Sequence, residues 1–216
     1  METIISVDDV SFSYGSAPEP ALAHVSFNVH QGDFIGIIGP SGAGKSTLAA
    51  CLSGAVPHHY TGTFFGSVTV DGHDTCEVSL TDVSQIVGSV LQDIDTQMVA
   101  SVVEDEMLFG LENFGVPHDQ IEQRVSETLE TVGISDLRDR EIATLSGGQK
   151  QKVAIAAILA MRPRVLVLDE PTAALDPASS TLVFETLREA NRALGITIVV
   201  VEQKVALLSE YCNRVL

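Results

Sequence analysis

Positive charge is scarce in this chain. Its 216 residues include 12 Lys and Arg against 29 Asp and Glu, which gives a formal net charge of -17. Lys45 is the only Lys or Arg between residues 1 and 123. Affinity for nucleic acid grows from clusters of Lys and Arg that neutralise phosphates, so we expect no nucleic-acid partner. An anionic ligand at Lys45 would pair with this lone cation; the alternative is a solvent-exposed lysine, which costs little.

Other absences narrow the class of protein further. The longest apolar run, residues 153–161, is far shorter than the ~20 residues that a membrane helix needs. Residues 1–10 contain acids but no cation, so we expect neither a secretory signal nor a transit peptide. The scattered cysteines, Cys51, Cys76 and Cys212, favour unpaired thiols in a reducing compartment over a disulfide framework or a zinc site.

A phosphate-binding loop follows the apolar run 34–38, which predicts a buried strand. The loop fits G-x-x-x-x-G-K-[ST], and its glycines let backbone N–H groups face phosphate oxygens at the start of a helix. We expect Lys45 to reach the β- and γ-phosphates of a nucleotide and Ser46 to ligate Mg²⁺; families with this loop use the next residue, Thr47, at the α-phosphate. The loop comprises Gly39, Pro40, Ser41, Gly42, Ala43, Gly44, Lys45, Ser46 and Thr47.

Two carboxylates, Asp169 and Glu170, close the apolar run 165–168. The run predicts a buried strand, and ligands of open α/β sheets bind at the carboxyl ends of strands. We therefore expect Asp169 to position Mg²⁺. The alternative is an ordinary solvated strand end, which the phosphate loop makes the weaker interpretation.

A second anion site is predicted at Ser146, Gly147 and Gly148. Here a serine hydroxyl and two glycines, which have no side chains to cover their N–H groups, begin a helix. A simple helix cap is the alternative. Because the chain already has a phosphate loop, this second site makes most sense facing another subunit.

The alternation of strands and helices predicts a mostly parallel sheet. Apolar patterns predict strands at residues 4–10, 24–30, 66–70, 86–91 and 196–201, and helices at 102–113, 119–132, 147–161 and 178–194. The first three strands suggest an antiparallel patch, and the first two helices suggest an insert between the halves of the core. Residues 214–216 look like the start of a strand, so we expect the native chain to continue past residue 216.

The order of these motifs resembles the ATP-binding cassette (ABC) ATPases. Residues 145–149 read LSGGQ, the family signature, and lie between the phosphate loop and the two carboxylates. The resemblance covers essentially the whole chain. It implies an α/β P-loop NTPase of the ABC type, with a mostly parallel sheet core, an antiparallel β patch and a helical insert. It also implies one domain over residues 1–216, with the core and patch at roughly 1–91 and 161–216 and the insert at roughly 92–160.

In this family two domains form a head-to-tail dimer around ATP and Mg²⁺. The resemblance implies that the signature residues Ser146, Gly147, Gly148 and Gln149 complete the ATP site of a second domain, whether that domain is a copy, a different chain or a fused repeat. It implies that Glu170 polarises the attacking water and that Asp176, in the family's D-loop, couples the two sites. Taken alone, Asp176 followed by proline could be only a turn.

Two further roles come from the resemblance. Tyr14 matches the aromatic residue on which adenine stacks, although a single Tyr in a loop is more often packing. Gln92, after the strand at 86–91, matches the family's Q-loop glutamine, which contacts Mg²⁺ and the transmembrane partner. A Gln at a strand end would otherwise be unremarkable.

One position departs from the family pattern. After the strand at 196–201 the family usually has a His that contacts the γ-phosphate, whereas this chain has Gln203 between Glu202 and Lys204. An amide donates a hydrogen bond but carries no charge, so the site is expected to hydrolyse slowly or to be the less active of an unequal pair. Gln203 could instead merely pack beside the strand, with Glu202 or Lys204 governing the site.

One stretch narrows the resemblance to the ATPase component of energy-coupling factor (ECF) importers of vitamins or transition-metal ions. It comprises residues 92–98, 102–106 and 109–113. In these systems two ATPase domains bind a transmembrane coupling protein with arginines on its cytoplasmic helices, and a small membrane protein selects the substrate. The resemblance implies a peripheral position on the cytoplasmic face of the membrane. The acid-rich segment 93–106 is expected to contact such arginines, or else to be a solvated helix face.

Two other functions stay open. One is a non-transport ABC ATPase of DNA repair or translation, although the sequence lacks the long coiled-coil insertions or basic arms of that class. The other is a nucleotide-dependent binding module with little turnover, which Gln203 alone motivates.

Overall fold

The computed structural model describes residues 2–15, 17 and 19–216. Among them, an antiparallel sheet in the order β2-β1-β4-β5 is formed by β1 (Thr3–Tyr14), β2 (Leu22–His30), β4 (Gly62–Val70) and β5 (His73–Asp74). A parallel sheet in the order β6-β7-β8-β3-β9 is formed by β3 (Phe34–Ile37), β6 (Val87–Val90), β7 (Val165–Asp169), β8 (Thr197–Val201) and β9 (Arg214–Val215). The expected parallel core and antiparallel patch are confirmed.

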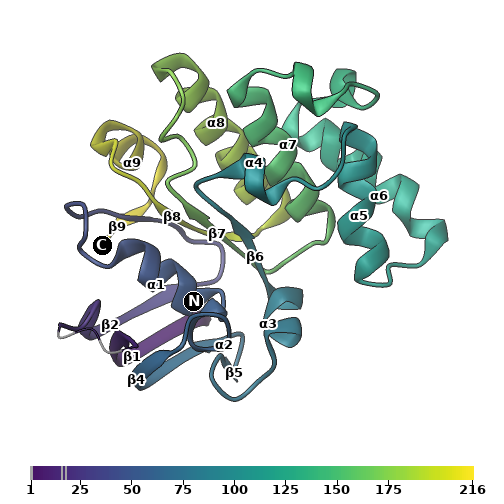
Figure 1. Cartoon of the computed structure of the whole chain (residues 1–216). Coiled ribbons are helices and arrows are strands. Elements are labelled where there is room, and N and C mark those ends of the chain that lie inside the picture. Colours follow the sequence, from purple (N-terminus) through teal and green to yellow (C-terminus); the bar gives the residue numbers. More distant parts are fainter. Residues whose placement is uncertain (1, 16, 18) are drawn as a thin grey trace.

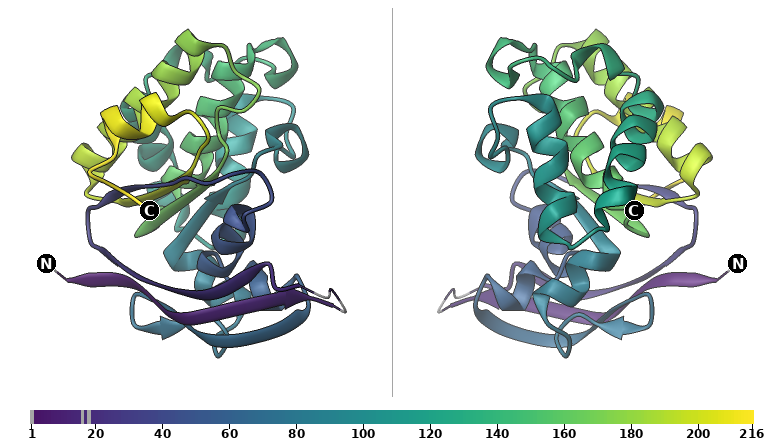
Figure 2. Two further views of the ribbon diagram at one scale, coloured as in Figure 1. Left: turned by 90° about the vertical axis from the view of Figure 1, so that its left-hand side faces the viewer. Right: turned by 90° about the vertical axis from the view of Figure 1, so that its right-hand side faces the viewer.

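Helices fill the space between the sheets and cover the outer face of the parallel sheet (Figures 1 and 2). On the inner side lie α1 (Lys45–Leu52), α2 (Ala55–His58) and α3 (Leu80–Ile86). The other helices are α4 (Ile94–Gln97), α5 (Val103–Asn113), α6 (His118–Val132), α7 (Gly147–Ala160), α8 (Pro177–Leu194) and α9 (Val205–Tyr211). None of the helices described has the length and apolar character needed to span a bilayer.

The parallel sheet separates two hydrophobic cores. Along β7, Val165 and Val167 pack with α1 and the antiparallel sheet, whereas Leu166 and Leu168 pack under α5 to α9. Side chains alternate across a strand, so a strand buried on both faces must be apolar throughout. This explains the uninterrupted aliphatic run before Asp169, whose position at the carboxyl edge is therefore set by the core.

Two elements differ from expectation. The apolar run 86–91 is not one strand, because Ile86 ends α3 and β6 begins at Val87. A capping box starts α3: the Ser79 Oγ accepts the Asp82 N–H at 3.2 Å, and the Asp82 carboxylate accepts the Ser79 N–H at 3.3 Å. This S-x-x-D signal is visible in the sequence and predicts a helix start. Tyr14, expected in a loop, is the last residue of β1.

Candidate functional site

The phosphate loop connects β3 to α1 at the carboxyl edge of the parallel sheet. Gly44, the residue before α1, has a φ of 88°, in the left-handed region that favours glycine. A Cβ at Gly44 would lie 2.2 Å from the backbone oxygen of Ala21, the residue before β2. The loop is thus pressed against the antiparallel sheet at a point where only glycine fits.

Lys45 lies under this loop and is only 8% exposed. Its ammonium donates hydrogen bonds to the backbone oxygens of Gly39 at 3.0 Å and Pro40 at 3.1 Å. A bound phosphate would exchange these carbonyls for charged oxygens, which make stronger partners for an ammonium.

Tyr14 and Thr47 meet beside the loop although they are far apart in the sequence. The Tyr14 hydroxyl and the Thr47 Oγ1 are 3.0 Å apart, within hydrogen-bonding distance. The ring of Tyr60 packs edge-on against that of Tyr14, with centroids 6.2 Å apart. The residues expected at the adenine and at the α-phosphate are therefore neighbours.

Asp169 and Ser46 line the same cavity of about 620 Å³. Burial raises the pKa of Asp169; the nearby Ser46 side chain lowers it, and the Glu170 charge raises it. The Asp169 Oδ1 is buried and has no hydrogen-bond partner among the described residues. A buried carboxylate oxygen without a donor, next to a hydroxyl, offers the hard oxygen ligands that Mg²⁺ prefers, so the residues fit this ion.

Glu170 follows β7 and contacts both the end of β8 and Gln203. Its N–H donates to the Val201 oxygen at 2.9 Å, and its carboxylate accepts a hydrogen bond of 2.7 Å from the Gln203 amide. Its φ of 47° is unusual for a residue with a side chain and is a strain of about 1 kcal/mol or more. The structure thus brings together the two residues expected to act in hydrolysis.

The signature residues begin α7. The Ser146 Oγ accepts the Gln149 N–H at 3.3 Å, and the Gln149 side chain accepts the Ser146 N–H at 2.9 Å. The amides of Gly147 and Gly148 occupy the first helical positions, which have no acceptor within a helix. Ser146 and Gly148 line a different cavity, of about 220 Å³, from the one that holds Ser46 and Asp169.

Asp176 and Gln92 are the two remaining site residues that the resemblance implies. Asp176 caps α8 by accepting the Ser179 N–H at 3.0 Å and the Ser179 hydroxyl at 2.6 Å, bonds that hold the pKa of Asp176 below its usual value. Gln92 lines a cavity of about 220 Å³ together with Glu170 and Gly147.

Sequence reasoning missed Gln97. Its side chain accepts the Leu91 N–H at 2.9 Å and donates to the Ser89 oxygen at 3.0 Å, so it fixes the end of β6 just before Gln92. No local signal identifies this role, because it depends on how the chain turns back after the strand.

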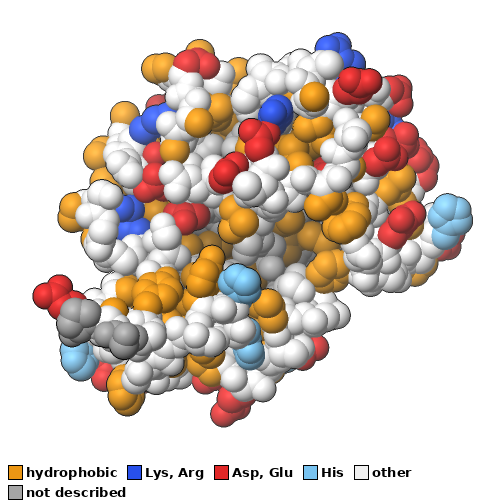
Figure 3. Space-filling model, in the orientation of Figure 1, with side chains coloured by type: hydrophobic (Ala, Val, Ile, Leu, Met, Phe, Trp, Pro, Cys, Tyr) orange, Lys and Arg blue, Asp and Glu red, His pale blue; other side chains and the backbone are white. Residues whose placement is uncertain are grey.

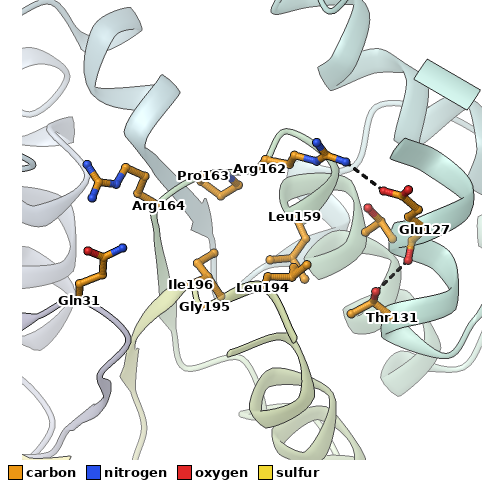
Figure 4. A pocket seen from close by; sticks show the side chains of 11 residues that line it. Gln31, Glu127, Thr131, Leu159, Arg162, Pro163, Arg164, Leu194, Gly195 and Ile196 are labelled. Atoms are coloured by element: carbon orange, nitrogen blue, oxygen red, sulfur yellow. Dashed lines mark hydrogen bonds and ion pairs between the residues drawn. The ribbon is translucent and has the colours of Figure 1, made fainter. Parts of the chain in front are cut away.

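Another cavity, of about 320 Å³, lies at the opposite edge of the parallel sheet (Figure 4). It opens where β7 and β8 begin, between Arg164 and Ile196. Its two arginines point away from each other: Arg162 pairs with Glu127 at 2.9 Å and Arg164 pairs with Asp71. It is therefore separate from the phosphate loop and is not part of the candidate site.

Comparison with known proteins identifies the family. The family model described as ABC transporter matches residues 22–173, well over half of the chain. The chain belongs to the ABC transporter ATP-binding family. This is a family of ATPase domains, and the expected ABC-type P-loop fold is confirmed.

Relatives and solved structures support this assignment. A putative ABC transporter ATP-binding protein of Streptomyces avermitilis is 44% identical over 98% of this chain, which spans 38% of that protein's length. A relative from Pyrococcus horikoshii is 43% identical over 98% of this chain and 75% of its own length.

CbiO1 from Clostridium perfringens, described as part of the ABC transporter complex cbiONQ, superposes with a TM-score of 0.89 at 33% identity, over 100% of this chain and 84% of its own. The dimeric bacterial ABC transporter cassette MJ0796 gives a TM-score of 0.79 at 27% identity, over 98% of this chain and 92% of its own.

The contact between Gly44 and Ala21 leads to a prediction for this ABC domain. Gly42→Ala, at a φ of 82° in open space, should lower the free energy of unfolding by about 1 kcal/mol. Gly44→Ala adds a clash with the Ala21 oxygen, so it should lower the free energy of unfolding by about 2–4 kcal/mol. Urea denaturation of both variants measures the difference. Equal losses would contradict the close packing of the loop.

Proposed function

We propose that this ABC domain hydrolyses ATP in a head-to-tail dimer and powers the import of a vitamin or metal ion through an ECF-type transporter on the cytoplasmic face of a membrane. The observation that carries the hydrolytic part is the hydrogen bond between Gln203 and Glu170, beside Asp169 and the phosphate loop. The similarity to CbiO1 over the whole chain supports the importer class.

The phosphate loop and its neighbours hold the nucleotide in this proposal. Lys45 exchanges its carbonyl partners for the β- and γ-phosphates, and Thr47 contacts the α-phosphate. Tyr14, hydrogen-bonded to Thr47, stacks on the adenine. Ser46, Asp169 and Gln92 would hold Mg²⁺, which neutralises charge on the phosphates when bound.

Glu170 polarises the attacking water. Phosphoryl transfer needs positioning and electrostatic stabilisation more than covalent chemistry from the protein, so the orientation of this carboxylate matters. The Gln203 amide donates a hydrogen bond to one carboxylate oxygen at 2.7 Å, so the other oxygen is the one that would accept from the water. Gln203 therefore acts through Glu170 as well as toward the γ-phosphate.

The second half of each site comes from a partner domain. Ser146, Gly147, Gly148 and Gln149 form the start of α7, a helix start suited to anions. Ser146, Gly148 and Gln149 line a cavity apart from the chain's own phosphate loop. A partner's γ-phosphate is the natural ligand, and Asp176 couples the two sites. The dimeric arrangement reported for MJ0796 supports this proposal.

Substitution of Glu170 tests the proposed hydrolysis. Glu170→Gln removes the polarising charge but no phosphate contact, so ATP binding should persist while single-turnover hydrolysis falls by about a hundredfold or more. An ATP-bound dimer should accumulate, which light scattering would detect. Lys45→Ala should instead weaken ATP binding itself at matched Mg²⁺. Near-normal hydrolysis in Glu170→Gln would overturn the role of this residue.

Substitution of Gln203 tests its part in the chemistry. Gln203→Ala should slow single-turnover hydrolysis, because Glu170 loses its donor. Gln203→His should raise the rate roughly several-fold, since an imidazole can become cationic as charge builds on the phosphoryl group. ATP affinity should change little in both variants. Unchanged rates in both would show that Gln203 only packs beside the strand.

The face toward the viewer in Figure 3 is hollowed and bordered by hydrophobic side chains. The cavity of about 620 Å³ extends from Asp169 along α1, with Tyr60, Leu80 and Leu91 exposed among its lining residues. Val99 and Phe109, 60% and 50% exposed, line a neighbouring cavity with Asp105 and Glu112. An apolar surface with acids beside it suits a coupling protein with apolar and arginine side chains.

Internal contacts narrow which acids are available to such arginines. Glu106 is 7% exposed, and its carboxylate accepts the N–H groups of Val99 at 3.0 Å and Ala100 at 2.8 Å. Asp95 pairs with Lys150 at 2.7 Å, and Glu104 pairs with Arg138. The segment 93–106 therefore offers chiefly Asp93 and Asp105 to a partner.

Affinity purification tests the partner class. The tagged chain, recovered from detergent-solubilised membranes of its own cell, should bring integral membrane proteins with it. A double variant, Asp105→Lys with Phe109→Asp, reverses the charge and polarity of this face and should lose them. Glu130→Lys, an exposed change on α6, is the matched control and should retain them. Recovery of no membrane protein by the unaltered chain would contradict the importer proposal.

A further inference from the structure

The segment after β8 makes contacts that the proposed hydrolysis does not use. Glu202 is 1% exposed, and its carboxylate accepts the Thr172 hydroxyl at 2.5 Å. The same carboxylate accepts the N–H groups of Gln203 at 2.8 Å and Lys204 at 3.2 Å. A buried carboxylate requires several donors to offset its loss of hydration, and here they come from the segment itself and from Thr172. The backbone around Lys204 is thereby fixed.

Lys204 directs its ammonium at the D-loop, residues 174–176, and at residues that precede and follow it. It donates to the Thr172 oxygen at 2.7 Å, the Leu175 oxygen at 3.2 Å and the Ser180 Oγ at 2.7 Å. An ammonium has three N–H donors, so these acceptors account for all of them. Lys204 therefore has no donor left for a nucleotide.

The D-loop in turn supports the signature helix. A Cβ at Gly147 would lie 3.1 Å from the Leu175 Cδ2, and a Cβ at Gly148 would lie 3.2 Å from the Ser179 Cβ. The start of α7 thus rests on the residue whose carbonyl Lys204 holds and on the first turn of α8. A displacement of Leu175 would be transmitted directly to Gly147.

We propose that Lys204 is a positioning residue that fixes the D-loop and, through Leu175, the signature residues at the start of α7. It acts on the surface offered to a second domain and not on the domain's own nucleotide. The inference rests on the proposed head-to-tail dimer and assigns to Lys204 the preorganisation of its interface.

The test compares variants made in the Glu170→Gln background of the 216-residue chain. Lys204→Met should raise the dissociation constant of the ATP-bound dimer about tenfold or more, since a charged donor with three partners is lost. ATP affinity of the single domain should stay within about twofold. Lys204→Arg retains the charge and donors and should recover most of the dimer.

Matched controls separate positioning from charge and from folding. Arg192→Met removes the same single positive charge from the exposed end of α8, so it should leave the dimer constant nearly unchanged. Ser180→Ala keeps the ammonium but removes one acceptor, and should weaken the dimer about threefold even if Lys204→Met folds poorly. Sedimentation velocity with ATP and Mg²⁺ measures each constant.

The outcomes distinguish the two proposals. If the Glu170→Gln parent dimerises with ATP and its Lys204 and Ser180 variants dimerise equally well, the role of Lys204 is overturned. That result would leave the head-to-tail arrangement standing. A parent that forms no ATP-dependent dimer would overturn the head-to-tail arrangement and the role of Lys204 with it. Equal weakening by Arg192→Met would assign the effect to net charge and also contradict the inference.

Discussion

The register between β7 and β8 is the constraint on which the whole catalytic edge depends. Asp169 pairs with Val201, so the chain leaves both strands at the same level. The Glu170 N–H then bonds to Val201, and the Glu202 N–H bonds to Ile37 on the next strand at 3.2 Å. A shift of one residue would exchange the two buried faces of either strand, so both cores oppose it. This one strand pairing therefore brings Asp169 and Glu170 close to Gln203 and Lys204.

Local patterns predicted the parts of the site that depend on local chemistry. The phosphate loop, the aliphatic strand before Asp169 and the cap at Ser146 each follow from a few adjacent residues, and the structure places them as elements of the expected kind. The boundary at Ile86 was wrong because an apolar run does not show where a helix stops and a strand begins. The roles of Lys204 and Glu106 could not be predicted, because no local pattern shows which groups the fold brings into contact with them. Thr172, for example, lies 32 residues from Lys204 in the sequence.

The few cations of this chain are used mainly inside it. Lys45 and Lys204 bind backbone carbonyls, and Arg138 joins Glu104 to Glu122 across the helical part. The outer surface is left strongly acidic, in keeping with the formal charge of -17. Two copies of such a surface repel each other. A dimer of these domains would have to derive its stability from ligand contacts and close packing at the interface. The stability of that dimer would therefore depend more on the geometry of the D-loop and signature residues than it would in a neutral protein.

The backbone oxygens of Gly39 and Pro40 accept hydrogen bonds from the Lys45 ammonium, so they compete with any ligand that binds in the phosphate loop. A ligand with one weakly charged group would have to displace the Gly39 and Pro40 oxygens and would offer little in return. A ligand with several phosphates offers more charge at the same ammonium, and charged acceptors bind it about twice as strongly as neutral ones. In the proposed nucleotide site, the loop would therefore discriminate by the number of phosphates and favour triphosphates over nucleosides and monophosphates.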